Sequence, residues 1–160
     1  MDHVINGLPV HVLVVHFVVI VVPVAALALL LTALWPAARR RLGIVTPIIA
    51  LAALISVPIA TEAGEWLQER VGRTDLIEEH EELGETLLPW AVGVFVLAVL
   101  QWVWFRFVAP RVPKAGRLAI GIVLAVLVAV AAVGSVVTVI RIGESGSKAV
   151  WSGSFSEEPL

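Results

Sequence analysis

The stretch LPVHVLVVHFVVIVVPVAALALLLTALW, residues 8–35, decides the fold. It contains no Asp, Glu, Lys or Arg, and about 20 helical residues are enough to cross the hydrocarbon of a bilayer. A spanning segment has to satisfy its backbone hydrogen bonds internally, so we expect a transmembrane helix despite the many β-branched residues. Three further long apolar segments follow, at about residues 42–60, 86–108 and 115–140. The sequence therefore predicts four membrane spans.

The composition agrees with a membrane protein. Hydrophobic residues make up 59% of the 160 residues and charged residues only 15%, whereas a soluble domain is about half apolar and about a quarter charged. The chain has no cysteine, which excludes disulfides, thiolate metal sites, iron–sulfur clusters and covalently attached c-type haem. The segment before the first span has no Lys or Arg and carries Asp2, so we expect that span to be retained rather than cleaved as a signal peptide.

The charges between the spans predict their orientation. The loops after spans one and three are basic, with Arg39, Arg40, Arg41, Arg106, Arg111, Lys114 and Arg117, and basic loops stay on the cytoplasmic side. Residues 61–85 form an acidic, partly helical loop, which we place outside with both termini and the polar tail 152–160. The sequence thus predicts a single all-α membrane domain over residues 1–160, an up-down-up-down four-helix bundle in the cell inner (cytoplasmic) membrane with N-out and C-out topology.

Several residues mark the expected ends of these helices. Pro9 suits the first turn of span one, where its missing N–H costs nothing. Thr74 or Asp75 is suited to cap a helix that leads into span three. Gly143 is a candidate C-cap of span four, and His3 falls in the N-terminal tail.

The unusual polar residues gather at the predicted outer end. His11 lies about one turn inside span one and His16 lies deeper, while Glu62, His80 and Glu144 lie at or near the outer ends of spans two, three and four. No span has an ionisable residue near its centre, which argues against the midplane site of a transporter. We therefore expect the cytoplasmic half to be scaffold and any site to lie at the outer end.

The spacing of the histidines restricts how they can act. His11 and His16 are five residues apart, about 140° around a helix, so one undistorted helix cannot hold an ion with both. His80 shares a helical face with Leu76 and Leu83. His80 is therefore expected to face the bundle or a neighbouring helix while the surrounding glutamates form a solvated face, and the alternative that remains open is a solvated loop histidine within a run of charges.

Three blocks of sequence resemble those of a known family. The first is GLPVHVLVVHF, residues 7–17, which is similar to a G-L-P-x-H-P-x-x-V-H-F pattern. The second is HEELG, residues 80–84, against H-x-x-L-G, and the third is RIGESGSKAVW, residues 141–151, against R-x-G-H-x-G-x-x-x-V-W. In this order they resemble an uncharacterised family of small four-helix bacterial membrane proteins, predicted membrane proteins with a domain of unknown function.

The resemblance implies a site but no reaction. His11, His16 and His80 match the histidines of the family pattern, whereas Val12 replaces a proline and Glu144 stands where the family often has histidine. The histidine pattern suggests haem or metal binding. A carboxylate at position 144 can bind a hard or borderline ion, but it is an unusual axial ligand of haem.

Two classes of function remain open from the sequence. The first is a cofactor site at the extracytoplasmic end that binds haem b or a transition-metal ion, with His11, His16 and His80 as imidazole ligands and Glu144 or Glu62 as a carboxylate ligand. The alternative is a non-catalytic accessory or assembly subunit without a cofactor, whose partner in the bilayer is another membrane protein or a second copy. No nucleophile–base pair or phosphate loop favours an enzyme, and nothing indicates nucleic-acid binding.

Overall fold

A computed structural model describes residues 3–154 of the chain. Within these residues four helical segments are long and apolar enough to cross a membrane. They are α1 (Val10–Leu34), α3 (Val45–Val71), the combined run Asp75–Arg111, and α6 (Lys114–Trp151). The combined run consists of α4 (Asp75–Glu85), α5 (Leu87–Val103), the π-helix η1 (Trp104–Val108) and the short 3₁₀ helix η2 (Ala109–Arg111). The prediction of an all-α protein with four candidate spans is confirmed.

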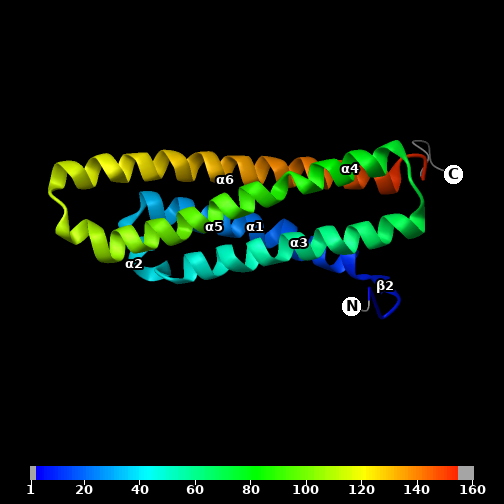
Figure 1. Cartoon of the computed structure of the whole chain (residues 1–160), viewed down its shortest axis with the longest axis horizontal. Coiled ribbons are helices and arrows are strands. Elements are labelled where there is room, and N and C mark those ends of the chain that lie inside the picture. The colour runs from blue at the N-terminus through cyan, green and yellow to red at the C-terminus, as the bar shows by residue number, and fades with distance from the viewer. Residues whose placement is uncertain (1–2, 155–160) are drawn as a thin grey trace, which may run out of the picture.

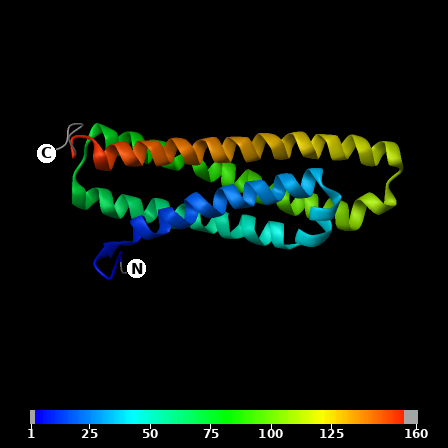
Figure 2. The same ribbon diagram turned by 180° about the vertical axis from the view of Figure 1, so that it is seen from behind.

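The long helices form an antiparallel bundle. In Figures 1 and 2, α1 and α5 run in one direction and α3 and α6 in the other. Each helix packs against the next along the chain, and α6 packs back against α1. We call the end with residues 61–85 the acidic end, and the end with α2 (Pro36–Leu42), η1 and η2 the basic end. Both described chain ends lie at the acidic end (Figure 1).

Helices at the acidic end extend beyond the apolar segments. At the end of α3, Gly72 has a φ of 87°, and the Thr74 side chain then caps α4 by accepting a hydrogen bond from the Ile77 N–H at 3.3 Å. The prediction of Thr74 as a helix cap is confirmed. The prediction that Gly143 ends span four is wrong, because α6 continues to Trp151 and packs against α4. This packing stabilises a helical stretch that its two internal glycines alone would weaken.

A small β-hairpin precedes α1. Its strands are β1 (Val4–Ile5) and β2 (Leu8–Pro9). Between them Asn6 and Gly7 have φ values of 50° and 81°, as a two-residue hairpin turn requires. Pro9 is the residue before α1 rather than part of its first turn. His3 does not form a free tail, because its ring stacks on the indole of Trp66 at a centroid distance of 4.9 Å and an interplanar angle of 9°.

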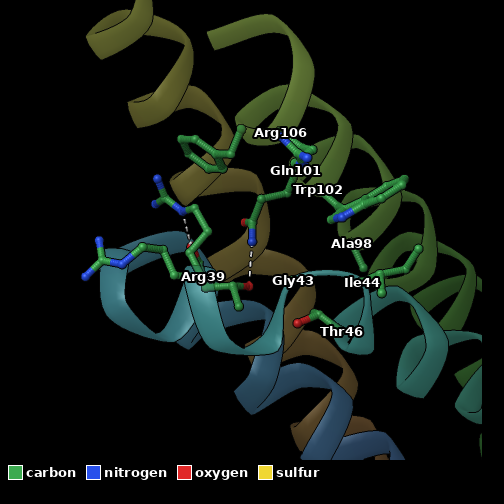
Figure 3. A pocket seen from close by; sticks show the side chains of 11 residues that line it. Arg39, Gly43, Ile44, Thr46, Ala98, Gln101, Trp102 and Arg106 are labelled. Atoms are coloured by element: carbon green, nitrogen blue, oxygen red, sulfur yellow. Dashed lines mark hydrogen bonds between the residues drawn. The ribbon is translucent and has the colours of Figure 1, made fainter. Parts of the chain in front are cut away.

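Arg39 closes the basic end of α1. From α2 its guanidinium donates hydrogen bonds to the carbonyl oxygens of Thr32 and Ala33 at 2.8 and 2.7 Å, which gives partners to carbonyls that a helix end leaves free. The same group lies 3.3 Å from the ring centroid of Phe105, a cation–π contact. Gln101 of α5 donates to the Thr32 hydroxyl at 2.6 Å (Figure 3). These contacts join α1, α2 and α5.

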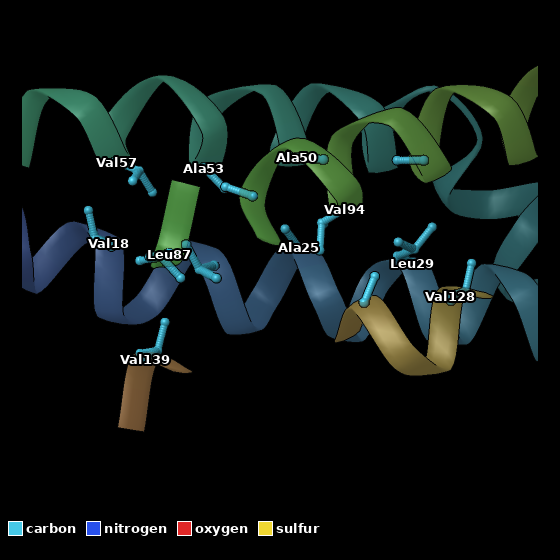
Figure 4. Packing of buried hydrophobic residues seen from close by; sticks show 14 of the residues in the cluster. Val18, Ala25, Leu29, Ala50, Ala53, Val57, Leu87, Val94, Val128 and Val139 are labelled. Atoms are coloured by element: carbon cyan, nitrogen blue, oxygen red, sulfur yellow. The ribbon is translucent and has the colours of Figure 1, made fainter. Parts of the chain in front are cut away.

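Small side chains line the contacts between the long helices (Figure 4). In a bilayer the lipid is as apolar as the core, so close approach of backbones and van der Waals packing hold helices together. Larger side chains such as Leu29, Val94 and Val128 fill the remaining space and are completely or almost completely buried. Small residues buried on α3 and α6 include Ala50, Ala53, Ser56, Ala132 and Ser135.

Close packing makes one glycine sensitive to substitution. A Cβ at position 134 would overlap the indole ring of Trp90, so Gly134→Ala is expected to lower the free energy of unfolding by about 1–3 kcal/mol. Thermal unfolding in detergent measures this change. Gly143→Ala is the control, because Gly143 lies in the same helix with nothing within 4 Å of its Cβ position. It should be neutral or stabilising, and equal unfolding temperatures for both variants would contradict the packing described.

Candidate functional site

Two of the predicted histidines meet at the acidic end. His11 in the first turn of α1 and His80 in the middle of α4 have ring centroids 6.3 Å apart and an interplanar angle of 84°. Both side chains are half-buried. They come together because α4 folds back onto α3 and α6 after the short connection at Gly72. The prediction from the sequence that His80 faces the bundle rather than solvent agrees with this position.

The surroundings of His11 fix its orientation. Its Nδ1 lies 2.9 Å from the carbonyl oxygen of Ala60 in α3. A carbonyl only accepts, so Nδ1 carries the hydrogen, and in the neutral ring Nε2 keeps a free lone pair. The ring also lies against Gly64, where a Cβ would be only 3.0 Å from two ring atoms. The absence of a side chain at Gly64 thus provides room for the imidazole beside α3.

His80 has an equivalent arrangement with α6. Its Nδ1 lies 3.0 Å from the hydroxyl oxygen of Ser145, and that hydroxyl donates to the carbonyl oxygen of Ile142 at 3.0 Å. Because the serine hydrogen is already used, the serine oxygen accepts the Nδ1–H of His80, and Nε2 again keeps its lone pair. A Cβ at Gly146 would lie 2.9 Å from the Cε1 of His80, so this ring is also held closely.

The surroundings of His80 favour its neutral form. Helix α4 has six acidic residues among its eleven and lies outside the apolar spans. Burial lowers the pKa of His80 and the neighbouring His11 lowers it further, while the Ile142 backbone acts in the opposite direction. A histidine with a lowered pKa stays neutral further into the acidic range, and the neutral imidazole is the form that binds metal ions.

The other predicted ligands do not join this pair. His16 is exposed, and its Nδ1 lies 2.5 Å from the carbonyl oxygen of Val12 in its own helix. Glu62 and Glu144 are also exposed. In the described part of the chain no three His, Asp or Glu side chains lie close enough together to hold a metal ion. The structure thus brings together His11 and His80 but not His16, Glu62 or Glu144.

The charges at this end are mostly separate from one another. Residues 3–154 contain one ion pair within 4.0 Å, between the side chains of Arg70 and Glu69, which lie 3.3 Å apart on the surface. In this part of the chain Arg141 of α6 has no carboxylate within 4.0 Å. Glu81 instead accepts a hydrogen bond from the buried Gln68 side chain at 2.6 Å, which ties α4 to α3.

Three residues of the site were not predicted from the sequence. They are Ser145, which fixes the His80 ring, and the glycines Gly64 and Gly146, against which the two rings pack. A glycine inside a helical segment is a recognised signal of close approach. The sequence offered this signal twice, because Gly64 lies between Glu62 and Glu65 and Gly146 lies in the third sequence block.

Comparison with known families agrees with the sequence blocks. A family model described as "Predicted membrane protein (DUF2231)" matches residues 7–158. The chain belongs to the DUF2231 family. Neither the curated proteins nor the solved structures include a match to it. In this DUF2231 protein the three blocks lie far apart in sequence, yet His11, His80 and Ser145 from them meet at one end of the bundle.

The bond between His80 and Ser145 can be tested with a matched pair of serines. Ser145→Ala leaves the Nδ1–H of a half-buried ring without its acceptor, so we expect a loss of about 1–3 kcal/mol in the free energy of unfolding. Ser147→Ala is the control, since Ser147 is exposed and bonds only to the Gly143 carbonyl of its own helix at 2.8 Å. Unfolding in detergent compares the two, and equal effects would show that the bond does not hold α4 to α6.

Proposed function

We propose that this DUF2231 member binds a divalent transition-metal ion at the acidic end, with the Nε2 atoms of His11 and His80 as its protein ligands. The observation that carries the proposal is that both Nδ1–H groups are already committed, to the Ala60 carbonyl and the Ser145 hydroxyl. Histidine ligands of metals characteristically donate their second N–H in this way, which fixes the ring and the tautomer. Imidazole is a good ligand for zinc, copper and nickel ions.

Two protein ligands leave coordination positions open. Water or a small ligand would complete the coordination, as in metal sites that exchange a ligand. Residues 61–85, which include His80, contain nine acidic residues and only two basic residues, Arg70 and Arg73. The acidic residues are Glu62, Glu65, Glu69, Asp75, Glu78, Glu79, Glu81, Glu82 and Glu85. Such a negative surface raises the local concentration of cations. On the orientation predicted from the basic loops, the site faces the extracytoplasmic side.

The packing of the two rings favours a bare ion over haem b. Gly64 and Gly146 lie so close to the imidazoles that a single added Cβ would crowd each ring. A haem macrocycle is far larger than an ion and would need space among α1, α3, α4 and α6, which pack around these rings. His16 is exposed on α1 and bonded to its own helix, so it does not supply a third ligand on this side.

The proposal is tested by metal binding to purified protein in detergent. After removal of bound metal with a chelator, the protein is titrated separately with zinc, copper and nickel ions and its metal content is determined by mass spectrometry. We expect one ion per chain and an affinity about 100-fold lower in His11→Ala and in His80→Ala, whereas His16→Ala should bind as the wild type does. Affinity should fall as the pH is lowered, because protons then compete with the metal for Nε2, and the lowered pKa of His80 moves this fall to a lower pH than for a free imidazole.

Three results would contradict the proposal. Wild-type protein that takes up no metal would favour the accessory-subunit alternative. An equal loss of binding in His16→Ala would show that the pair of His11 and His80 is not the site. A Soret absorption band that disappears in His80→Ala would identify haem as the ligand in place of a bare ion.

A further inference from the structure

The basic end of the bundle holds two adjoining cavities, and within residues 3–154 the arginines that line them have no carboxylate partner. The larger cavity has a volume of about 520 Å³, and its polar lining includes Arg39, Arg40, Arg106, Thr46 and Gln101 (Figure 3). A second cavity of about 350 Å³ shares Arg39 and adds Lys114 and Arg117. Neither lining includes an Asp or Glu.

The absence of carboxylates extends beyond the cavities. The sequence has no Asp or Glu between residues 3 and 61 or between residues 86 and 143, and these stretches contain all the basic residues of this end. Arg39 is half-buried, and in α2, between the spans, burial lowers its pKa. A guanidinium that has lost part of its hydration is stabilised by a bound anion. This end therefore has a positive charge that no carboxylate of the described residues neutralises by an ion pair.

Two buried polar atoms at the larger cavity also lack partners. Thr46 and Gln101 are only 2% and 3% exposed, and among the described residues neither the Thr46 Oγ1 nor the Gln101 Oε1 has a hydrogen-bond partner. The Gln101 amide cannot simply be turned round. The single hydrogen of the Thr32 hydroxyl points toward the carbonyls of Ala28 and Leu29, so the hydroxyl oxygen accepts from the Gln101 amide nitrogen.

Such unpartnered groups are rare and informative. An unsatisfied buried group costs about 1–3 kcal/mol, and in native proteins a missing ligand or water is a common explanation. Here one group is a hydroxyl that can donate and the other is a carbonyl that can accept. In Figure 3 the Thr46 oxygen faces the space beneath Gln101, between α2 and α5. A ligand that satisfies both carries a hydrogen-bond acceptor for Thr46 and a donor for Gln101, and beside Arg39, Arg40 and Arg106 an anionic oxygen is the favoured acceptor.

The π-helix η1 completes the lining. It follows α5 directly, and its residues Phe105 and Arg106 line the larger cavity. A π-turn is wider than an α-turn and often occurs at a functional site. The Phe105 ring lies against the Arg39 guanidinium, and Arg106 lines the same cavity. The π-helix therefore contributes to the same cavity as Arg39 and Arg40 of α2.

We propose that this cavity binds a phosphate group whose ester carries free hydroxyls. The anionic oxygens face Arg39, Arg40 and Arg106, the Thr46 hydroxyl donates to one of them, and the Gln101 Oε1 accepts a hydrogen bond from a ligand hydroxyl. This chemistry is common to the headgroup of phosphatidylglycerol and to free glycerol phosphate. Basic pockets between membrane helices are suited to lipid headgroups of this kind. The site is separate from the histidine pair and does not depend on metal binding there.

The test uses the full chain, delipidated in detergent, with two probes. Glycerol phosphate is added as the free ligand, and its effect on the unfolding temperature is measured. Phosphatidylglycerol is added as the lipid, with phosphatidylcholine as the zwitterionic comparison, and bound lipid is counted by native mass spectrometry. We expect stabilisation by glycerol phosphate or retention of phosphatidylglycerol over phosphatidylcholine, and the probe that acts identifies the source of the phosphate.

Matched variants distinguish the cavity from a generally basic surface. Thr46→Val keeps the side-chain volume and removes an unpartnered hydroxyl, so the ligand-free protein should unfold at the same or a higher temperature while ligand affinity falls about fivefold or more. Arg40→Gln should also lower affinity about fivefold. Arg41→Gln is the control, because Arg41 is the next residue in α2 and lines neither cavity.

Two outcomes would overturn this proposal. If Arg40→Gln and Arg41→Gln lower affinity equally and Thr46→Val has no effect, the anions bind only to the basic surface. If neither probe binds the wild-type protein in preference to the phosphatidylcholine comparison, the cavity is not a phosphate site. The fold of Thr46→Val is checked separately by its circular dichroism, so loss of binding is not confused with loss of structure.

Discussion

The requirement that backbone polar groups in hydrocarbon be satisfied within the segment governs this whole structure. It forces the four apolar segments into helices even where valine and isoleucine dominate the sequence. It also removes the usual hydrophobic drive for packing, so the helices meet through small side chains such as Ala25, Ala50 and Ala98. Strongly polar groups are then tolerated only near the ends, and chemistry can be placed only there.

The two ends have opposite electrostatic character but similar construction. At each end, a short helical connection folds over the bundle and presents polar side chains to groups on the long helices. At the acidic end α4 carries His80 to His11 and Ser145, and at the basic end α2 carries Arg39 to Thr32 and Phe105. The polar groups are held by hydrogen bonds in both cases, so their positions are determined by the fold rather than by flexible loops.

The sequence predicted what depends on local pattern and missed what depends on tertiary contact. Hydropathy located the four spans, the spacing of Leu76 and Leu83 directed His80 inward, and Thr74 was recognised as a cap. The continuation of α6 past Gly143 depends on packing against α4, which no local pattern reveals. From the sequence, candidate site residues were recognised only at the acidic end. Thr46 and Gln101 at the basic end were missed because they lie in apolar segments and carry no charge.

The π-helix η1 also alters the rotational phase of the third helical run. Along α5 the buried positions are 87, 91, 94, 98 and 101, a regular alternation of four and three residues. Continued without change, this alternation would turn position 108 toward the bundle, yet Val108 is 39% exposed and Ala109 only 4% exposed. The wider turn absorbs one extra residue, so the inward face advances by one position. An ordinary α-helical turn over the same residues would rotate Ala109 by about 100° away from the core, whereas deleting a single residue within η1 would let the α-helix continue with Ala109 still facing inward.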